Sequence, residues 1–126
     1  MKLKSSLVLD EKDDKAVQLF ADLGMPKNLA KTLMYISQVD ECCSREMEKV
    51  LGLRQPEVSI VMQELRRRRW AKKHDIKRKG RGRPVHVYKP AMHLPEILKA
   101  FEQEKLKEAE NVKRDISELR NIIKNR

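Results

Sequence analysis

The spacing of apolar residues predicts a helical N-terminal half. Between Asp13 and Leu23, apolar side chains recur at the intervals of one helical face, at Ala16, Val17, Leu19, Phe20 and Leu23. Gly24 follows, as is typical of a helix C-terminus. A second, buried helix is expected from near Pro26, with apolar positions Leu29, Ala30, Leu33, Met34 and Ile36. Residues 1–12 precede this pattern and are expected to form an N-terminal arm.

A short helical pattern and a longer one follow in quick succession. In "SREMEKVLGL", Ser44 suits an N-cap and Gly52 ends the helix, whose inward positions are Met47, Val50 and Leu51. In "LRQPEVSIVMQELRRRRW", Pro56 suits the start of a helix. The apolar face of this helix is Val58, Val61, Met62 and Leu65. A short helix, a tight turn and a longer helix in this order predict a helix-turn-helix.

A β-hairpin is expected directly after the longer helix. Trp70–Ile76 can form one strand, Lys77–Arg83 a turn, and Pro84–Tyr88 the returning strand. Its tip, "RGRP", resembles the core of the AT-hook, a peptide that lies in the minor groove of A·T-rich DNA. A hairpin that follows a helix-turn-helix is a wing, so residues 13–92 are expected to form a winged-helix domain with this motif at the wing tip.

A long helix is expected over residues 93–126, because no glycine occurs there and no proline follows Pro95. Its apolar residues alternate between steps of three and four, as in a coiled-coil seam, at Ala109, Val112, Ile116, Leu119 and Ile123. Lys105 interrupts the seam upstream. The predicted dimer interface consists of Leu94, Leu98, Phe101, Val112, Ile116, Leu119 and Ile123. The sequence leaves open whether the two helices run parallel or antiparallel.

The charge of the chain is concentrated in one segment. Residues 66–93 carry 12 basic side chains and one acidic side chain, a net charge of +11, whereas residues 1–65 carry −2 and residues 94–126 carry +1. A focused basic field attracts polyanions, first of all nucleic acid.

Several other classes of function are not supported by the sequence. No apolar run is long enough to cross a bilayer or to serve as a signal peptide, so no membrane association and a cytoplasmic location are expected. Cys42 and Cys43 are adjacent and are interpreted as packing residues, with a redox role as the alternative. No metal-ligand motif, cofactor motif or catalytic constellation is present. We therefore expect no metal, no cofactor and no enzymatic activity.

The segment "LRQPEVSIVMQELRRRRW" resembles the recognition helix of winged-helix transcription regulators of the ArsR, MarR and TrmB type, with an archaeal character. "LGMPKNLAKTLMYI" and "GRGRPVHVYKP" are similar to the preceding helix and to the wing of these families, so the resemblance covers roughly residues 20–90. The chain departs from the pattern at Arg69, where many relatives carry a glycine before the aromatic residue. The helix is therefore expected either to end at some strain or to extend.

The candidate DNA contacts lie on the outer side of the second helix of the helix-turn-helix and on the wing. Glutamine can offer a donor and an acceptor to adenine, and an exposed isoleucine suits a thymine methyl group. Arginines at the wing tip suit a narrow minor groove. The candidates are Arg54, Gln55, Ser59, Ile60, Gln63, Arg66, Arg67, Lys77, Arg78, Lys79, Arg81 and Arg83. The alternative interpretation is that these helix residues form an ordinary solvent-exposed face with one exposed apolar residue and do not contact DNA.

These patterns predict a sequence-specific regulator that binds double-stranded DNA as a homodimer and blocks or recruits transcription machinery. The recognition helix would occupy the major groove and the wing the minor groove. Two alternatives remain open at this point. One is an architectural chromatin protein with little sequence choice. The other is a winged-helix scaffold for a protein or RNA complex.

Overall fold

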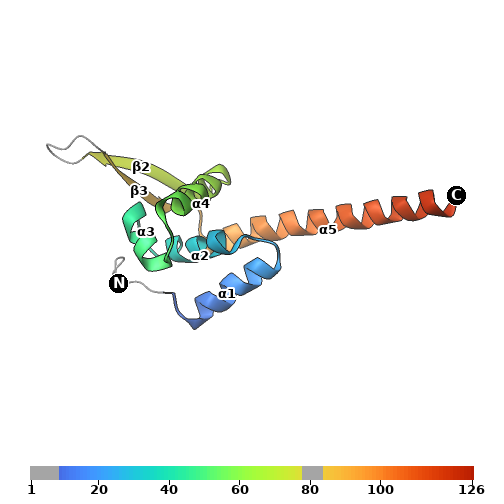
Figure 1. Ribbon diagram of the computed structural model, residues 1–126, viewed down its shortest axis with the longest axis horizontal. Coiled ribbons are helices and arrows are strands. Elements are labelled where there is room, and N and C mark those ends of the chain that lie inside the picture. The colour runs from blue at the N-terminus through green and yellow to red at the C-terminus, as the bar shows by residue number, and fades with distance from the viewer. Residues whose placement is uncertain (1–8, 78–83) are drawn as a thin grey trace. The chain divides into compact units, whose positions relative to one another are not determined.

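The computed structural model describes residues 9–77 and 84–126, and the chain divides into two compact units, residues 1–93 and residues 94–126 (Figure 1). In its described residues the first unit has four helices and a three-stranded antiparallel sheet, and the second unit is one long helix. This confirms the expected fold class: mainly α with a small β-hairpin, arranged as a winged helix-turn-helix that is followed by a long C-terminal helix.

Helix α1 spans Glu11–Asp22 and begins two residues before the expected start at Asp13. The reason is a capping box: the side chain of Asp10 accepts the backbone N–H of Asp13 at 2.9 Å, and Asp13 accepts that of Asp10 at 3.0 Å. These hydrogen bonds hold the pKa of the exposed Asp10 below its ordinary value, the bond from the backbone of Asp13 first among them. Gly24 follows the helix with φ +103°, as expected of a glycine there.

The buried face of α1 is narrower than its apolar pattern suggested. Val17 and Phe20 are buried, but Leu19 and Leu23 are 50% and 53% exposed. The buried positions of this helix therefore run from Asp13 through Val17 to Phe20. Asp13 accepts a hydrogen bond from Gln38 Nε2 at 3.0 Å, which satisfies part of its buried carboxylate.

Helix α2, Lys27–Ile36, forms the centre of the core. Every apolar position predicted for it is buried: Leu29, Ala30, Leu33, Met34 and Ile36. Tyr35 and Thr32 are buried as well, and the Thr32 hydroxyl donates to the Asn28 carbonyl at 2.8 Å. A helix buried on so many sides has little freedom to move, so it provides a rigid base for the elements that pack on it.

Helices α3, Ser44–Leu51, and α4, Gln55–Arg67, form the helix-turn-helix. Gly52 joins them with φ +67°, a left-handed conformation that glycine adopts at little cost. Cys43, not the expected Ser44, is the N-cap of α3, and its backbone N–H donates to Glu46 Oε1 at 2.9 Å. Pro56 is the second residue of α4, next to the expected first position.

The sheet contains a strand that the sequence did not predict. Strands β2, Ala71–Lys77, and β3, Pro84–Pro90, form the expected hairpin, with His74 opposite Val87. Strand β1, Cys42–Cys43, pairs antiparallel with β3 on its other side, so the order is β1-β3-β2. The base of the hairpin is thereby hydrogen-bonded to the segment that leads into α3. Of the predicted turn, Lys77–Arg83, Lys77 is the last residue of β2, and residues 78–83 lie outside the described residues.

Arg69 joins α4 to β2 in a left-handed conformation, with φ +66°. Among the described non-glycine residues it is the one with positive φ. Of the two outcomes expected from the missing glycine, the chain adopts the strained one. The backbone N–H of Trp70 then donates to the Leu65 carbonyl at 2.9 Å, which closes the helix end.

The second unit is helix α5, Leu94–Lys124. Toward its start Ile97 and Phe101 are buried, whereas Leu98 is 50% exposed. The sequence placed Leu94, Leu98 and Phe101 in the predicted dimer interface, and of these three Phe101 is buried within the single chain. Lys105 lies over the Phe101 ring, with Nζ 5.4 Å from its centroid, and forms an ion pair with Glu108 at 3.0 Å. No helix in the described residues has both the length and the apolar composition needed to cross a membrane.

Candidate nucleic-acid interface

Helix α4 has one buried side and one exposed side, in the register that the sequence predicted. Val58, Val61, Met62 and Leu65 are all at most 6% exposed. Gln55, Ile60, Gln63 and Arg66 are exposed, and Ser59 is half-buried. Ile60 is 68% exposed, more than any other large apolar side chain among the described residues. The outer side of α4 therefore presents amide, hydroxyl, guanidinium and methyl groups together.

The base of the hairpin extends this surface. A hollow of about 170 Å³ lies between α4 and the hairpin, lined by Gln55, Ser59, Met62, Gln63, Arg66, Lys73, His86 and Tyr88. Strand alternation explains the contribution of the hairpin. Lys73 is paired directly with Tyr88, and His86 lies two residues before Tyr88 on the same face of β3. The helix and the hairpin thus contribute to one continuous, mostly polar surface.

A second hollow lies along α4. It has a volume of about 600 Å³ and is lined by Pro26, Asn28, Leu29, Glu57, Ile60, Val61, Gln63, Glu64, Arg67 and Arg68. Gln63 lines both hollows, so it lies on a ridge of α4 between them. A helix is about 10–12 Å in diameter and the DNA major groove is about 12 Å wide. A ridge of this kind can enter such a groove without meeting the rest of the domain.

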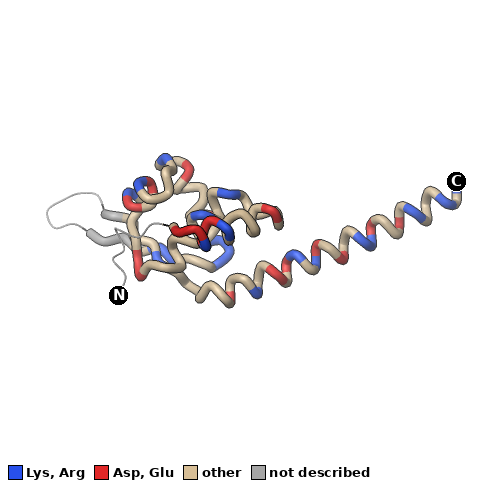
Figure 2. The backbone as a smooth tube through the Cα atoms, turned by 90° about the horizontal axis from the view of Figure 1, so that it is seen from below, with Lys and Arg blue, Asp and Glu red and all other residues tan. Residues whose placement is uncertain are grey.

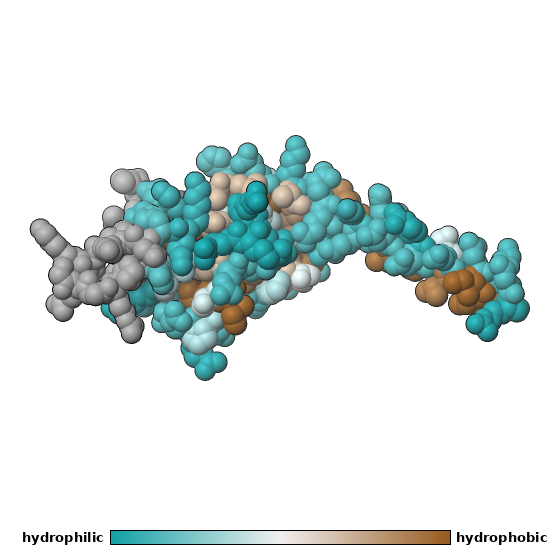
Figure 3. Space-filling model, turned by 90° about the horizontal axis from the view of Figure 1, so that it is seen from above, coloured by the Kyte–Doolittle hydropathy of each residue, from teal (hydrophilic) through white to brown (hydrophobic). Residues whose placement is uncertain are grey.

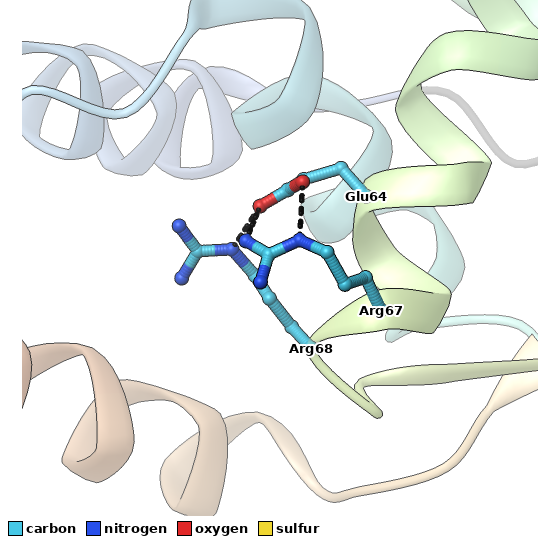
Figure 4. Close-up of polar contacts among 3 residues, drawn as sticks. All are labelled: Glu64, Arg67 and Arg68. Atoms are coloured by element: carbon cyan, nitrogen blue, oxygen red, sulfur yellow. Dashed lines mark hydrogen bonds and ion pairs between the residues drawn. The ribbon is translucent and has the colours of Figure 1, made fainter.

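The arginines at the C-terminus of α4 do not all face outward. Glu64 accepts hydrogen bonds from Arg67 Nε at 3.0 Å and Nη2 at 2.6 Å, and from Arg68 Nε at 2.7 Å (Figure 4). These bonds, from Arg67 first and then Arg68, lower the pKa of Glu64 to about 2. The guanidinium of Arg68 also lies 4.9 Å from the centroid of the buried Trp70 ring.

This arrangement changes the expectation for Arg67. The sequence grouped it with the DNA-contacting residues, but its guanidinium is held by Glu64 in a bidentate ion pair. Arg66 has a different position, because it lines the hollow beside the hairpin. Arg54, before α4, is exposed, and its backbone N–H donates to Glu57 Oε1 at 2.8 Å. The Arg54 guanidinium forms an ion pair with Glu57 at 3.9 Å, longer than the 2.6 Å pair of Arg67 with Glu64.

Most of the residues predicted for the wing lie outside the part of the chain that the structure describes. Arg78, Lys79, Arg81 and Arg83 lie outside the described residues, and Lys77 is described only as the last residue of β2. Two residues of this surface were missed from the sequence: Lys73 and His86. The available signal was strand alternation, which puts both on the same face as Tyr88.

The two cysteines form strand β1 and differ in burial. Cys42 is 2% exposed, and burial raises the pKa of its thiol to about 12. Cys43 is half-buried, and both thiols are free. Within the described part of the chain, the hydroxyl of the buried Tyr35 has no hydrogen-bond partner, and burial raises the pKa of this hydroxyl. No group of three or more potential metal ligands occurs in residues 9–77 and 84–126.

Comparisons with known proteins find likenesses in overall structure. No family model matches the chain. No curated protein matches it either. Among solved structures, a transcriptional regulator homologue from Pyrococcus horikoshii OT3 is 20% identical with a TM-score of 0.49, over 79% of this chain and 95% of that one. Pex from Synechococcus sp. is 19% identical with a TM-score of 0.45, over 80% of this chain and 98% of that one. The function proposed for the chain therefore depends on its own geometry.

Proposed function

We propose that the protein is a DNA-binding transcription regulator that recognises duplex sequence through α4. The observation that carries this proposal is the outer side of α4, where Gln55 lines one hollow, the 68% exposed Ile60 lines the other and Gln63 lines both. Glutamine amides match the donor and acceptor of adenine, and an isoleucine side chain matches a thymine methyl group. The exposed isoleucine adds an apolar contact group to the polar groups on this face.

The hairpin would contribute the second contact. Its base supplies Lys73 beside α4, and residues 66–93 carry a net charge of +11, whereas the whole chain carries +10. Lysines along strand and turn fix the position of a protein on the phosphate backbone. We infer that Lys77, Arg78 and Lys79 contact phosphates, and that the tip residues Arg81 and Arg83 enter the minor groove, where narrow A·T-rich tracts attract arginine.

The protein would act as a homodimer. One recognition helix contacts one half-site, and two such units related by a two-fold axis contact an inverted repeat. Apolar residues in the C-terminal part of α5 are exposed in the single chain, and they form a visible patch near its end (Figure 3). Exposed apolar patches on a chain of this size mark interaction surfaces.

The direct test is binding of the purified protein to duplex DNA over a series of salt concentrations. A dimer that neutralises about 6–10 phosphates should lose about 10³- to 10⁵-fold in affinity between about 50 and 200 mM salt. Selection of bound fragments from random-sequence DNA should then yield an inverted repeat. A flat salt profile would contradict DNA binding.

Two further outcomes would point to other functions. Equal affinity for selected and unselected duplexes would indicate an architectural protein. Preference for structured RNA over duplex DNA at the same salt concentration would indicate a scaffold for an RNA complex. Both outcomes differ from the proposed one in what is bound, so a single set of competition experiments separates them.

A further inference from the structure

The exposed apolar residues of the last part of α5 form one stripe along the helix. Val112, Ile116, Leu119 and Ile123 are 55%, 49%, 56% and 67% exposed. Their spacing of four, three and four residues is that of alternate d and a positions of a heptad repeat. Ile116 and Ile123 then occupy a positions, and Val112 and Leu119 occupy d positions. Such a stripe is complementary to a second copy of itself.

The kinds of residue on the stripe distinguish between coiled-coil geometries. A β-branched residue at a together with leucine at d favours two parallel strands, because the two positions differ in how the side chains pack into the facing helix. Ile116, Leu119 and Ile123 follow this pattern. Val112, at d, is the exception and makes the stripe less than ideal.

The charges beside the stripe give a stronger indication. With Ala109 at the a position before Ile116, the positions that precede a, called g, carry Glu108, Asp115 and the apolar Ile122. The positions that follow d, called e, carry Lys113 and Arg120. Figure 2 shows basic and acidic residues alternating along this helix. In a parallel pair each g residue faces the e residue five positions further along the other helix, so every charged pair is attractive.

An antiparallel pair would have the opposite result. There e faces e and g faces g, so Lys113 and Arg120 would lie beside basic residues of the other copy. In the register that places residue 112 opposite residue 123, Asp115 would lie beside the apolar Ile122 and would have no basic partner. Like charges at these positions disfavour pairing. The arrangement of charge is therefore compatible with one orientation only.

The charged residues at g and e remain accessible in the single chain. Glu108 pairs with Lys105 of its own helix at 3.0 Å, but the Glu108 side chain is 54% exposed. An exposed pair three residues apart contributes little, so it can be exchanged for a contact with a second helix. Lys105 itself falls on the d position before Val112, which ends the apolar stripe on that side.

We propose that two copies of α5 pair in parallel and in register over residues 108–123, as a two-stranded coiled coil. The inference rests on the proposed homodimer and adds the orientation of its helices. In this arrangement Glu108 of each copy faces Lys113 of the other, and Asp115 faces Arg120. Both winged-helix units then leave the coil at the same end, because each precedes α5 in its chain.

The first test exchanges the charges. Glu108→Lys with Asp115→Lys makes all four positions basic, and it should raise the dimer dissociation constant about 10- to 100-fold, measured by sedimentation equilibrium. Adding Lys113→Glu and Arg120→Glu restores opposite charges and should return the constant to within about threefold of the wild type. In an antiparallel pair the like-charge contacts persist in all three proteins, so the three constants would be similar.

The second test uses disulfide formation. Val112→Cys should cross-link to itself under mild oxidation, and so should Ile123→Cys, because equal positions lie opposite each other in a parallel pair. A mixture of the two variants would form the mixed cross-link in the antiparallel arrangement, where residue 112 lies opposite residue 123. The unchanged chain, with Cys42 and Cys43, gives the background, and circular dichroism checks that each variant is folded.

The possible outcomes test the parallel orientation of the α5 helices separately from the proposed homodimer and DNA binding. A dimer with mixed cross-links and no response to charge exchange overturns the parallel arrangement but leaves the homodimer in place. A wild-type monomer at about 10 μM overturns both, since weaker pairing would be outside the range of a typical specific complex. Self cross-linking together with rescue by the four-residue exchange supports the proposal, whatever the DNA-binding experiments show.

Discussion

Arg69 holds a backbone conformation that disfavours residues with a Cβ atom. Its φ of +66° lies in the left-handed region, where the Cβ approaches the neighbouring carbonyl. Gly52 has nearly the same φ, +67°, without that cost. The sequence predicted the alternatives at Arg69 from one missing glycine, because the end of a helix has few possible geometries. It could not decide between strain and extension, which depends on how Trp70 packs.

We expect Arg69→Gly to stabilise the fold by about 1 kcal/mol, because glycine removes the left-handed strain. Gly52→Ala should have the opposite effect, a loss of about 1 kcal/mol. A Cβ at position 52 would meet no atom within 4 Å, so the loss would be conformational alone. Urea denaturation would measure both changes in the free energy of unfolding, and the dependence of this free energy on urea concentration should stay the same. A destabilised Arg69→Gly would show that the arginine side chain contributes more than its backbone strain costs.

The two thiols should react at very different rates. Cys42 is buried and its pKa is raised to about 12, so at pH 8 almost none of it is thiolate, the reactive form. Cys43 is half-buried and should be alkylated first. Mass spectrometry of the folded protein should find one modified cysteine, and the urea-denatured protein should carry two. Rapid modification of Cys42 in the folded protein would contradict the burial of this strand.

At the scale of elements, the sequence predicted the segments that are long enough to show a periodic apolar pattern, and it did not predict the two-residue strand β1. Helices α2, α3 and α4 and the hairpin follow from apolar spacing and from Gly24 and Gly52. Strand β1 has two residues, too few for any alternation to appear in the sequence. Its pairing with β3 holds Cys43 in an extended conformation, and for this reason Cys43 rather than Ser44 caps α3.

The candidate interface was predictable where it depends on helical periodicity. Burial of Val58, Met62 and Leu65 determines which side of α4 is exposed. The state of Arg67 was not predictable in the same way, because it depends on competition between solvent and Glu64 for its guanidinium. Lys73 could be recognised as part of the candidate interface only from the register of β2 and β3, which places it beside α4.

Substitutions on α4 and on β2 should have different effects on DNA binding. Gln63→Ala removes a base contact and should reduce affinity for the selected site by about 1–3 kcal/mol, with little effect on other sequences. Lys73→Ala removes a phosphate contact and should weaken all sequences alike, with a shallower salt dependence. Fluorescence anisotropy on selected and random duplexes measures both.

Lys99→Ala is a suitable control, because Lys99 is an exposed lysine outside the winged-helix unit. It removes the same charge and should leave both affinities nearly unchanged. If Gln63→Ala weakens every sequence equally, α4 is not the source of specificity, and the architectural function becomes the better description.

For the whole molecule, the separation into two units assigns different tasks to different parts of the sequence. Residues 1–93 carry the candidate interface and nearly all of the excess positive charge, and residues 94–126 carry the exposed apolar stripe with a net charge of +1. Near-neutral charge of mixed sign allows two such helices to approach each other, whereas a strongly basic helix would repel its copy. The heptad spacing and its interruption at Lys105 were both visible in the sequence.

Disruption of the stripe should separate dimerisation from folding. Ile116→Lys with Leu119→Lys places like charges at the centre of the proposed seam, and the chain should sediment as a monomer that retains its helical circular dichroism. Binding to an inverted repeat should fall to the level of a single half-site. Ser117→Lys, on the same helix but off the seam, should remain a dimer. A dimer that persists in the double variant would show that another surface joins the chains.

The shortness of the apolar stripe affects how the protein responds to its own abundance. Only residues 108–123 supply the proposed pairing, and coils of so few heptads separate at low concentration. Well below the dissociation constant, the number of dimers increases with the square of the number of chains. Occupancy of an inverted repeat would then increase twofold for about a 1.4-fold increase in chain number, so that regulation has a threshold set by the stability of one short pair of helices.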